Sequence, residues 1–228
     1  MIGASSSQRA YFGPFLVFLG LIGLGEFVAK IFDGRAVAWP LSTPMYWVFP
    51  LQTLVCGWLL ARWWPHYEMR APRRPVFTVL VGLLVLGLWI APQQFFHAEP
   101  RLDGFDPAHF GGGAPYWLNL GFRFLRLVIV VPLVEEIFWR GFLLRYLIGD
   151  DFAKVPFGAF TWLSFAVVTA GFTFEHSQAD WPAAALCGAL YNLVAYRTRS
   201  LSACVLAHAV TNLALGLYVL RTGQLGFW

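Results

Sequence analysis

Long runs of apolar residues, separated by short polar segments, dominate the 228-residue chain. A transmembrane α-helix needs about 20 predominantly apolar residues to cross the hydrocarbon core of a bilayer. The pattern therefore predicts an all-α fold, a polytopic transmembrane helical bundle of about seven to eight helices. The seven runs that we expect to be helical are Tyr11 to Phe32, Met45 to Trp64, Val76 to Phe96, Tyr116 to Ile148, Phe157 to His176, Pro182 to Tyr196 and Leu201 to Leu220.

Composition agrees with a membrane protein and excludes a soluble globular domain. Hydrophobic residues make up 58% of the chain and charged residues only 12%, whereas about 25% of residues are charged in typical soluble proteins. The mean hydropathy is +0.61, so the chain has more apolar surface than one soluble core of this length can bury. Because the runs leave only short connections, we expect residues 1–228 to form a single integral membrane domain.

The distribution of charge predicts the orientation in the membrane. The 16 Lys and Arg residues are dispersed between the apolar runs, which argues against a nucleic-acid partner and makes the lipid bilayer the expected one. Cytoplasmic loops carry an excess of Lys and Arg. Alternate connections here are basic, which predicts a cytoplasmic N-terminus and an external C-terminus. The residues concerned are Arg62, Arg70, Arg73 and Arg74, then Arg145 and Lys154, then Arg197 and Arg199.

Polar residues inside apolar runs are candidates for function, because a charge at the bilayer centre costs at least ~3 kcal/mol. The first cluster is Glu135 and Glu136, followed by Arg140. Glu136 and Arg140 are spaced i, i+4 and are expected to form a structural ion pair. Adjacent helix positions diverge by about 100°, so Glu135 faces elsewhere. It is expected to need a partner from another helix.

Two further clusters lie in later runs. Phe172 precedes His176 by one helical turn, and His208 and Asn212 share a helix face at i, i+4. Each cluster alone is more typical of interhelical hydrogen bonding than of catalysis. An acid, two imidazoles and an amide on three predicted helices together favour a catalytic site.

The order E-E-x-x-x-R, F-x-x-x-H and H-x-x-x-N resembles the CPBP family, which comprises type II CAAX prenyl endopeptidases, bacteriocin-processing proteins and related glutamic intramembrane proteases. The resemblance covers roughly Val131 to Asn212 and places a protease-like core at about residues 116–220. It implies a membrane-anchored or lipid-modified protein or peptide as substrate. Prenylated C-terminal motifs are the best-known targets of the proteins that this chain resembles.

The resemblance also implies roles for the motif residues. Glu135 and His176 would activate a water molecule, and His208 and Asn212 would stabilise the oxyanion. The remaining motif residues would support the site: Glu136, Arg140 and Phe172. These roles suit amide hydrolysis, which needs a base for the proton of the water and fixed donors at the developing oxyanion.

Two alternatives stay open. Glu135, His176 and His208 are chemically a possible zinc set, but no H-E-x-x-H motif is present, so we expect no cofactor and keep a zinc-dependent membrane metalloprotease as the rival mechanism. The other alternative is a non-enzymatic membrane scaffold, immunity or chaperone protein, because a fold does not by itself determine function. Replacing Glu135 with glutamine separates enzyme from scaffold.

Three neighbouring features have more ordinary interpretations. Arg123 and Arg126 are expected to extend towards lipid headgroups, with a substrate carboxylate as the alternative. Glu175 is interpreted as an interface-facing carboxylate, with a second catalytic acid as the alternative. Pro132 leaves room for a break in the long fourth run, whose first third is then expected along the membrane interface.

Overall fold

Helices account for all regular secondary structure in residues 6–228, the part of the chain that the computed structural model describes. The α-helices are α1 Ser6–Ile31, α2 Trp39–Ser42, α3 Met45–Trp63, α4 Pro75–Phe95, α5 Ala114–Phe124, α6 Val131–Glu136, α7 Leu144–Tyr146, α8 Trp162–Phe174, α9 Trp181–Thr198 and α10 Leu201–Thr222. Two π-helical segments, Leu125–Val130 and Ile137–Leu143, join α5 to α6 and α6 to α7. Short 3₁₀ turns cover Trp64–His66, Phe152–Lys154, Gln178–Asp180 and Leu225–Phe227. Helices occupy all seven predicted runs, so the all-α prediction is confirmed.

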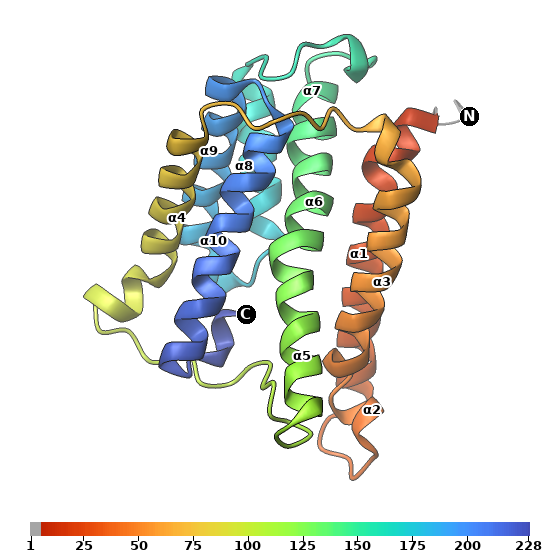
Figure 1. Cartoon of the computed structure of the whole chain (residues 1–228), viewed down its shortest axis with the longest axis vertical. Helices are drawn as coiled ribbons and strands as arrows, with labels where there is room; N and C mark the ends of the chain where they lie inside the picture. Colours follow the sequence, from red (N-terminus) through yellow and green to blue (C-terminus); the bar gives the residue numbers. More distant parts are fainter. Residues whose placement is uncertain (1–5) are drawn as a thin grey trace.

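The helices run roughly along one common axis (Figure 1). Helices α1 and α3 pack against each other, and so do α4 and α10, and α8 and α9. Between these groups runs the segment from α5 to α7, which contacts α1, α3 and α10. This arrangement puts the helix with the two adjacent glutamates in the middle of the bundle.

The central segment Ala114–Tyr146 is continuously helical, so the break for which Pro132 left room does not occur. Proline lacks an N–H and its ring crowds the preceding turn of an α-helix. The chain accommodates it with the π-helical turn immediately before, in which the N–H of Val131 bonds the carbonyl of Arg126. The first third of this helix follows the axis of the bundle (Figure 1), with Leu120, Arg123 and Arg126 buried.

Helix α8 begins five residues later than the sequence pattern indicated, at Trp162. Thr161 ends the preceding extended segment and forms a capping box with Ser164, in which each side chain bonds the backbone N–H of the other residue. Such reciprocal bonds satisfy N–H groups that the first helical turn leaves unpaired. The apolar residues before Thr161 therefore belong to the connection from α7.

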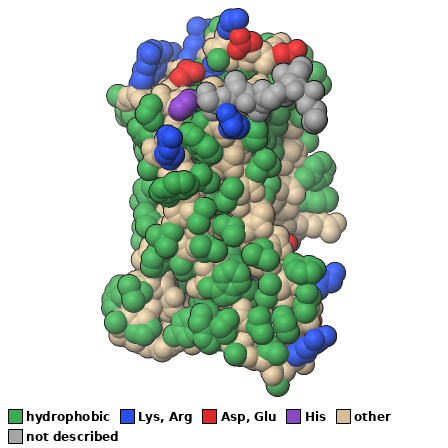
Figure 2. Space-filling model, turned by 90° about the vertical axis from the view of Figure 1, so that its right-hand side faces the viewer, with side chains coloured by type: hydrophobic (Ala, Val, Ile, Leu, Met, Phe, Trp, Pro, Cys, Tyr) green, Lys and Arg blue, Asp and Glu red, His purple; other side chains and the backbone are tan. Residues whose placement is uncertain are grey.

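Three helices in the described residues, α1, α4 and α10, are long and apolar enough to cross a membrane. Large apolar side chains such as Phe27, Leu80 and Leu217 are exposed on these helices, as lipid-facing residues are. On the face shown in Figure 2, hydrophobic side chains cover the middle of the molecule, and most of the charged ones gather at one end. The length, composition and exposed apolar side chains of these helices are those expected of a membrane protein.

Candidate functional site

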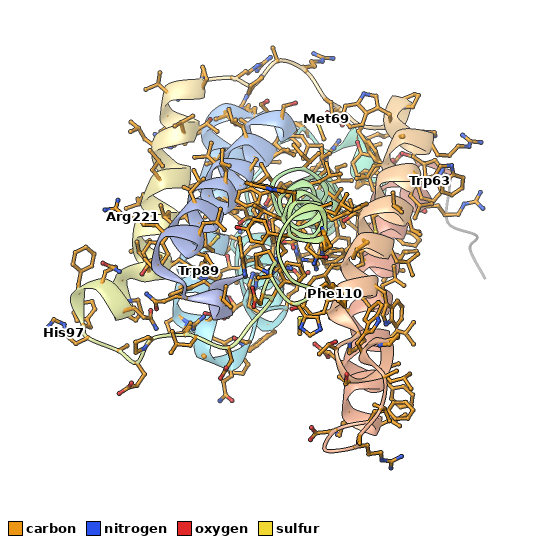
Figure 3. The ribbon with its side chains drawn as sticks, turned by 60° about the horizontal axis from the view of Figure 1, so that its bottom comes forward. Trp63, Met69, Trp89, His97, Phe110 and Arg221 are labelled. Carbon is orange, nitrogen blue, oxygen red and sulfur yellow. The ribbon has the colours of Figure 1, made fainter. Side chains whose placement is uncertain are left out.

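One cavity of about 260 Å³ is lined by all four residues that the sequence predicted to be catalytic. Glu135 comes from α6, His176 from the loop after α8, and His208 and Asn212 from α10. Trp89 of α4, labelled in Figure 3, also lines the cavity, and its ring centroid lies 5.3 Å from that of His176. The fold therefore brings together groups that are far apart in sequence.

Glu135 is buried and makes no hydrogen bond to the described part of the chain. The expected partner on another helix is absent there. The nearby cations that act on its carboxylate, Arg126 and Arg140, belong to the same central helix. This leaves the carboxylate oxygens available to a ligand in the cavity.

Glu136 and Arg140 form the expected i, i+4 ion pair, with Arg140 Nη1 donating to Glu136 Oε1 at 3.0 Å and both side chains fully buried. The same oxygen also lies 3.0 Å from Nδ1 of His208 on α10. The ion pair of Glu136 and Arg140 therefore does not act within one helix alone. It links the central helix to one of the candidate catalytic imidazoles.

The guanidinium of Arg140 is held on every side. Its Nε donates to Asn192 Oδ1 at 3.1 Å and its Nη2 to the carbonyl of Gly188 at 3.0 Å. The rings of Phe172 and Tyr191 lie 4.8 and 5.4 Å from its central carbon. A buried charge is tolerated when hydrogen bonds and an ion pair satisfy it. Arg140 therefore fixes α8 and α9 against the central helix.

The hydrogen bond to Glu136 determines which nitrogen of His208 faces the cavity. A carboxylate oxygen accepts, so the hydrogen lies on Nδ1 and Nε2 is the nitrogen left for a ligand. The ring of Tyr191 lies 5.2 Å from the imidazole, and its hydroxyl donates to Thr211 Oγ1 at 2.7 Å. Packing and hydrogen bonding together fix the plane of the His208 ring.

His176 is oriented in the same way by a backbone group. Its Nδ1 lies 2.8 Å from the carbonyl oxygen of Phe172. A carbonyl only accepts, so Nδ1 carries the hydrogen and Nε2 of the neutral ring keeps its lone pair. The imidazole lies 4.8 Å from the Phe172 ring. Phe172 thus orients His176 through its backbone and its side chain.

Asn212 Nδ2 donates to the carbonyl of Leu127 at 2.8 Å, and the local backbone explains why this carbonyl is free. Its α-helical partner would be the N–H of Val131, which instead bonds Arg126. Its π-helical partner would be Pro132, which has no N–H. Asn212 satisfies the carbonyl and retains a second N–H and its own oxygen. Chemically active groups often accompany such π-helical turns.

Glu175 lies on the cavity, which corrects its interpretation as an interface-facing carboxylate. Its Oε2 accepts a hydrogen bond from Trp139 Nε1 at 2.9 Å, and its Oε1 is buried without a partner in the described chain. The charges of Glu135 and Glu175 interact. In the sequence, only its position next to His176 indicated that Glu175 belongs to the site.

Arg123 and Arg126 are also placed differently from the expectation. They are 3% and 6% exposed and line the cavity, so they do not extend to the headgroup region. Continuity of the helix through Pro132 is the reason, because it carries α5 into the bundle.

No group of three or more His, Cys, Asp or Glu side chains in the described residues is positioned to hold a metal ion. The zinc set considered from the sequence, Glu135 with His176 and His208, is not assembled as ligands of one ion. The three cysteines are free and buried.

Comparison with known proteins gives one family. Residues 117–214 match the family of type II CAAX prenyl endopeptidase Rce1-like proteins. No match was found to a curated protein or to a solved structure. The matched segment contains every motif residue from Glu135 to Asn212. Residues 117–214 are therefore similar to this family, which agrees with the resemblance that the three motifs indicated.

Proposed function

We propose that the protein is an intramembrane endopeptidase that hydrolyses a peptide bond in a membrane-anchored or lipid-modified, CAAX-like protein or peptide. The observation that carries this proposal is the single cavity lined by Glu135, His176, His208 and Asn212. The match to a prenyl endopeptidase family over residues 117–214 supports the same reaction class.

In the proposed mechanism, Glu135 and His176 bind the attacking water, and one of them removes a proton as its oxygen bonds to the scissile carbonyl carbon. Glu135 makes no hydrogen bond to the described part of the chain, and Nε2 of His176 has an available lone pair, so either group can accept the proton. The tetrahedral intermediate then expels the amine, which takes that proton as the C–N bond breaks. The products are a carboxylic acid and an amine, and no metal is required.

The negative oxygen of the intermediate needs fixed donors. The second N–H of Asn212 and the Nε2–H of a protonated His208 are the groups proposed for this role. Donors that are already oriented towards an oxyanion contribute about 2.7 to 4 kcal/mol each to transition-state stability. The carboxylate of Glu136 balances the charge of an imidazolium at His208. Glu136, Arg140 and Phe172 are therefore positioning residues.

The test uses the full-length protein in lipid nanodiscs and an S-farnesylated peptide that ends in Cys followed by two aliphatic residues and a variable one. We expect the wild type and Glu99→Gln, which alters an exposed loop carboxylate, to produce a shorter peptide in mass spectra. Glu135→Gln should lose at least about a hundredfold in rate while still binding the peptide.

Three outcomes would decide against the proposal. Equal cleavage by Glu135→Gln and wild type would remove the glutamate from the mechanism. Loss of wild-type activity on treatment with 1,10-phenanthroline, with recovery on adding Zn²⁺, would favour the metalloprotease alternative. Binding without any cleavage by wild type would favour the scaffold alternative.

A further inference from the structure

Two arginines of the central helix lie in the candidate active-site cavity without a carboxylate partner. Arg123 and Arg126 are spaced i, i+3, and both line the cavity that also contains Glu135. Neither forms an ion pair with a carboxylate of the described residues. The charge of Arg126 interacts with that of Glu135, whereas the titratable groups that act on the charge of Arg123 are Arg126 and Tyr46.

Most of the hydrogen-bond donors of the two guanidinium groups are unused within the described chain. Arg126 donates only from Nε, to Gln52 Oε1 at 2.8 Å. Arg123 makes no hydrogen bond, and its Nε and Nη1 are buried without a partner. Unsatisfied buried charge is costly, so these donors require an additional acceptor when the site is occupied.

Aromatic rings hold the two guanidinium groups in place. Cation–π contacts of this kind stabilise a buried arginine but leave the N–H groups at its edge free. The central carbons of Arg123 and Arg126 lie between 4.3 and 5.9 Å from the rings of Phe18, Phe49, Phe105 and Trp228. The pair is therefore a fixed, positively charged fork rather than two mobile chains.

Distance along the helix sets the relation between this fork and the proposed catalytic groups. Arg126 precedes Glu135 by nine positions, which corresponds to about 13 Å at the helical rise. A substrate group bound at the fork is therefore held at a different level of the helix from the bond that is cut at Glu135.

A second cavity, of about 410 Å³ and bounded mainly by α1 and α3, adjoins the first at the arginine pair. Both cavities are lined by Ile22, Arg123, Arg126 and Trp228. A group bound at the fork therefore has room beside it for a further side chain.

We infer that Arg123 and Arg126 bind the C-terminal carboxylate of the substrate. This inference rests on the proposed function, because it assumes that the substrate is cut at Glu135. Arginine forks bind carboxylates through paired, charge-assisted hydrogen bonds. The two residues thus act as specificity-determining residues at a distance from the reacting bond.

The experiment uses the same S-farnesylated peptide in two forms, one with a free C-terminal carboxylate and one with a C-terminal amide. Wild type is expected to cleave the free acid about ten- to a hundredfold more efficiently. Arg123→Gln, Arg126→Gln and the double variant should lose this preference. Arg221→Gln, which removes an exposed arginine of α10 labelled in Figure 3, should retain it.

Binding to Glu135→Gln separates this inference from the proposed function. If no peptide is cleaved but this variant still binds the acid more tightly than the amide, the carboxylate site stands and the hydrolase proposal fails. If wild type cleaves the acid and the amide equally well, the hydrolase proposal stands and the carboxylate site fails. Arg126→Lys, which keeps the charge and loses the fork, should recover only part of the preference.

Anionic lipid is the other source of a group for this fork. The comparison is therefore repeated in nanodiscs of phosphatidylcholine alone and with phosphatidylglycerol added. An unchanged preference for the free acid supports the substrate-carboxylate site. Loss of that preference when phosphatidylglycerol is present would assign the fork to a lipid headgroup instead.

Discussion

Glu136 Oε1 lies 3.0 Å from Nδ1 of His208 and also accepts a hydrogen bond from Arg140. One carboxylate oxygen thus connects a buried ion pair of the central helix to an imidazole on α10. In the proposed mechanism this arrangement keeps Nε2 of His208 directed at the oxyanion. Glu135, next to it in sequence, makes no such bond and faces the cavity.

The first prediction concerns Glu136→Gln. The uncharged amide cannot balance an imidazolium at His208, so we expect kcat for the farnesylated peptide to fall about ten- to a hundredfold. KM should change much less, because an interaction made only in the transition state is weakened. Steady-state kinetics measure both, with Glu99→Gln as the exposed control. An unchanged kcat would separate Glu136 from the reaction.

Arg140→Ala is predicted to destabilise the protein. It removes three hydrogen bonds and leaves Glu136 buried without its cation. Breaking one side of a buried ion pair costs about 3 to 5 kcal/mol. Thermal unfolding of detergent-solubilised protein should therefore occur at a clearly lower temperature than in wild type. Arg221→Ala is the matched surface control, and equal melting of the two variants would contradict the structural role.

The hydrogen bond between Asn212 and Leu127 predicts an unusual rescue. Asn212→Ala leaves the Leu127 carbonyl unsatisfied, at a cost of about 1 to 3 kcal/mol. Pro132→Ala restores an N–H that can bond this carbonyl. The stability lost on Asn212→Ala should therefore be smaller in the Pro132→Ala background. Strictly additive effects in the double-mutant cycle would show that the two sites are independent. Activity should not recover, because the proposed oxyanion donor is still missing.

Orientation in the membrane is tested by cysteine labelling. The connection after α4, which carries Glu99, and the connection after α7, which carries Lys154, lie at opposite ends of the bundle (Figure 1). The basic connections predict that Lys154 faces the cytoplasm and that Glu99 faces outward. All three natural cysteines are buried, so the background from them should be low. In intact cells, an impermeant maleimide should label Glu99→Cys but not Lys154→Cys. The reverse pattern would invert the predicted topology.

The sequence was informative where spacing alone determines contact. Helical periodicity predicted the elements, and the i, i+4 spacing predicted the pair of Glu136 and Arg140, because both depend only on local geometry. It did not predict that His208 joins this pair, since contacts between helices depend on how they pack. The buried state of Arg123 was missed because basic residues near the end of an apolar run usually reach the headgroups.

Glu135 provides the most direct test of the central claim. Wild type and Glu135→Gln are compared in nanodiscs at equal amounts, with mass spectrometry of the farnesylated peptide after incubation in H₂¹⁸O. The account predicts that only wild type releases a product carrying ¹⁸O in its new carboxyl group, although both proteins bind the peptide. Equal release of labelled product by Glu135→Gln would contradict the account.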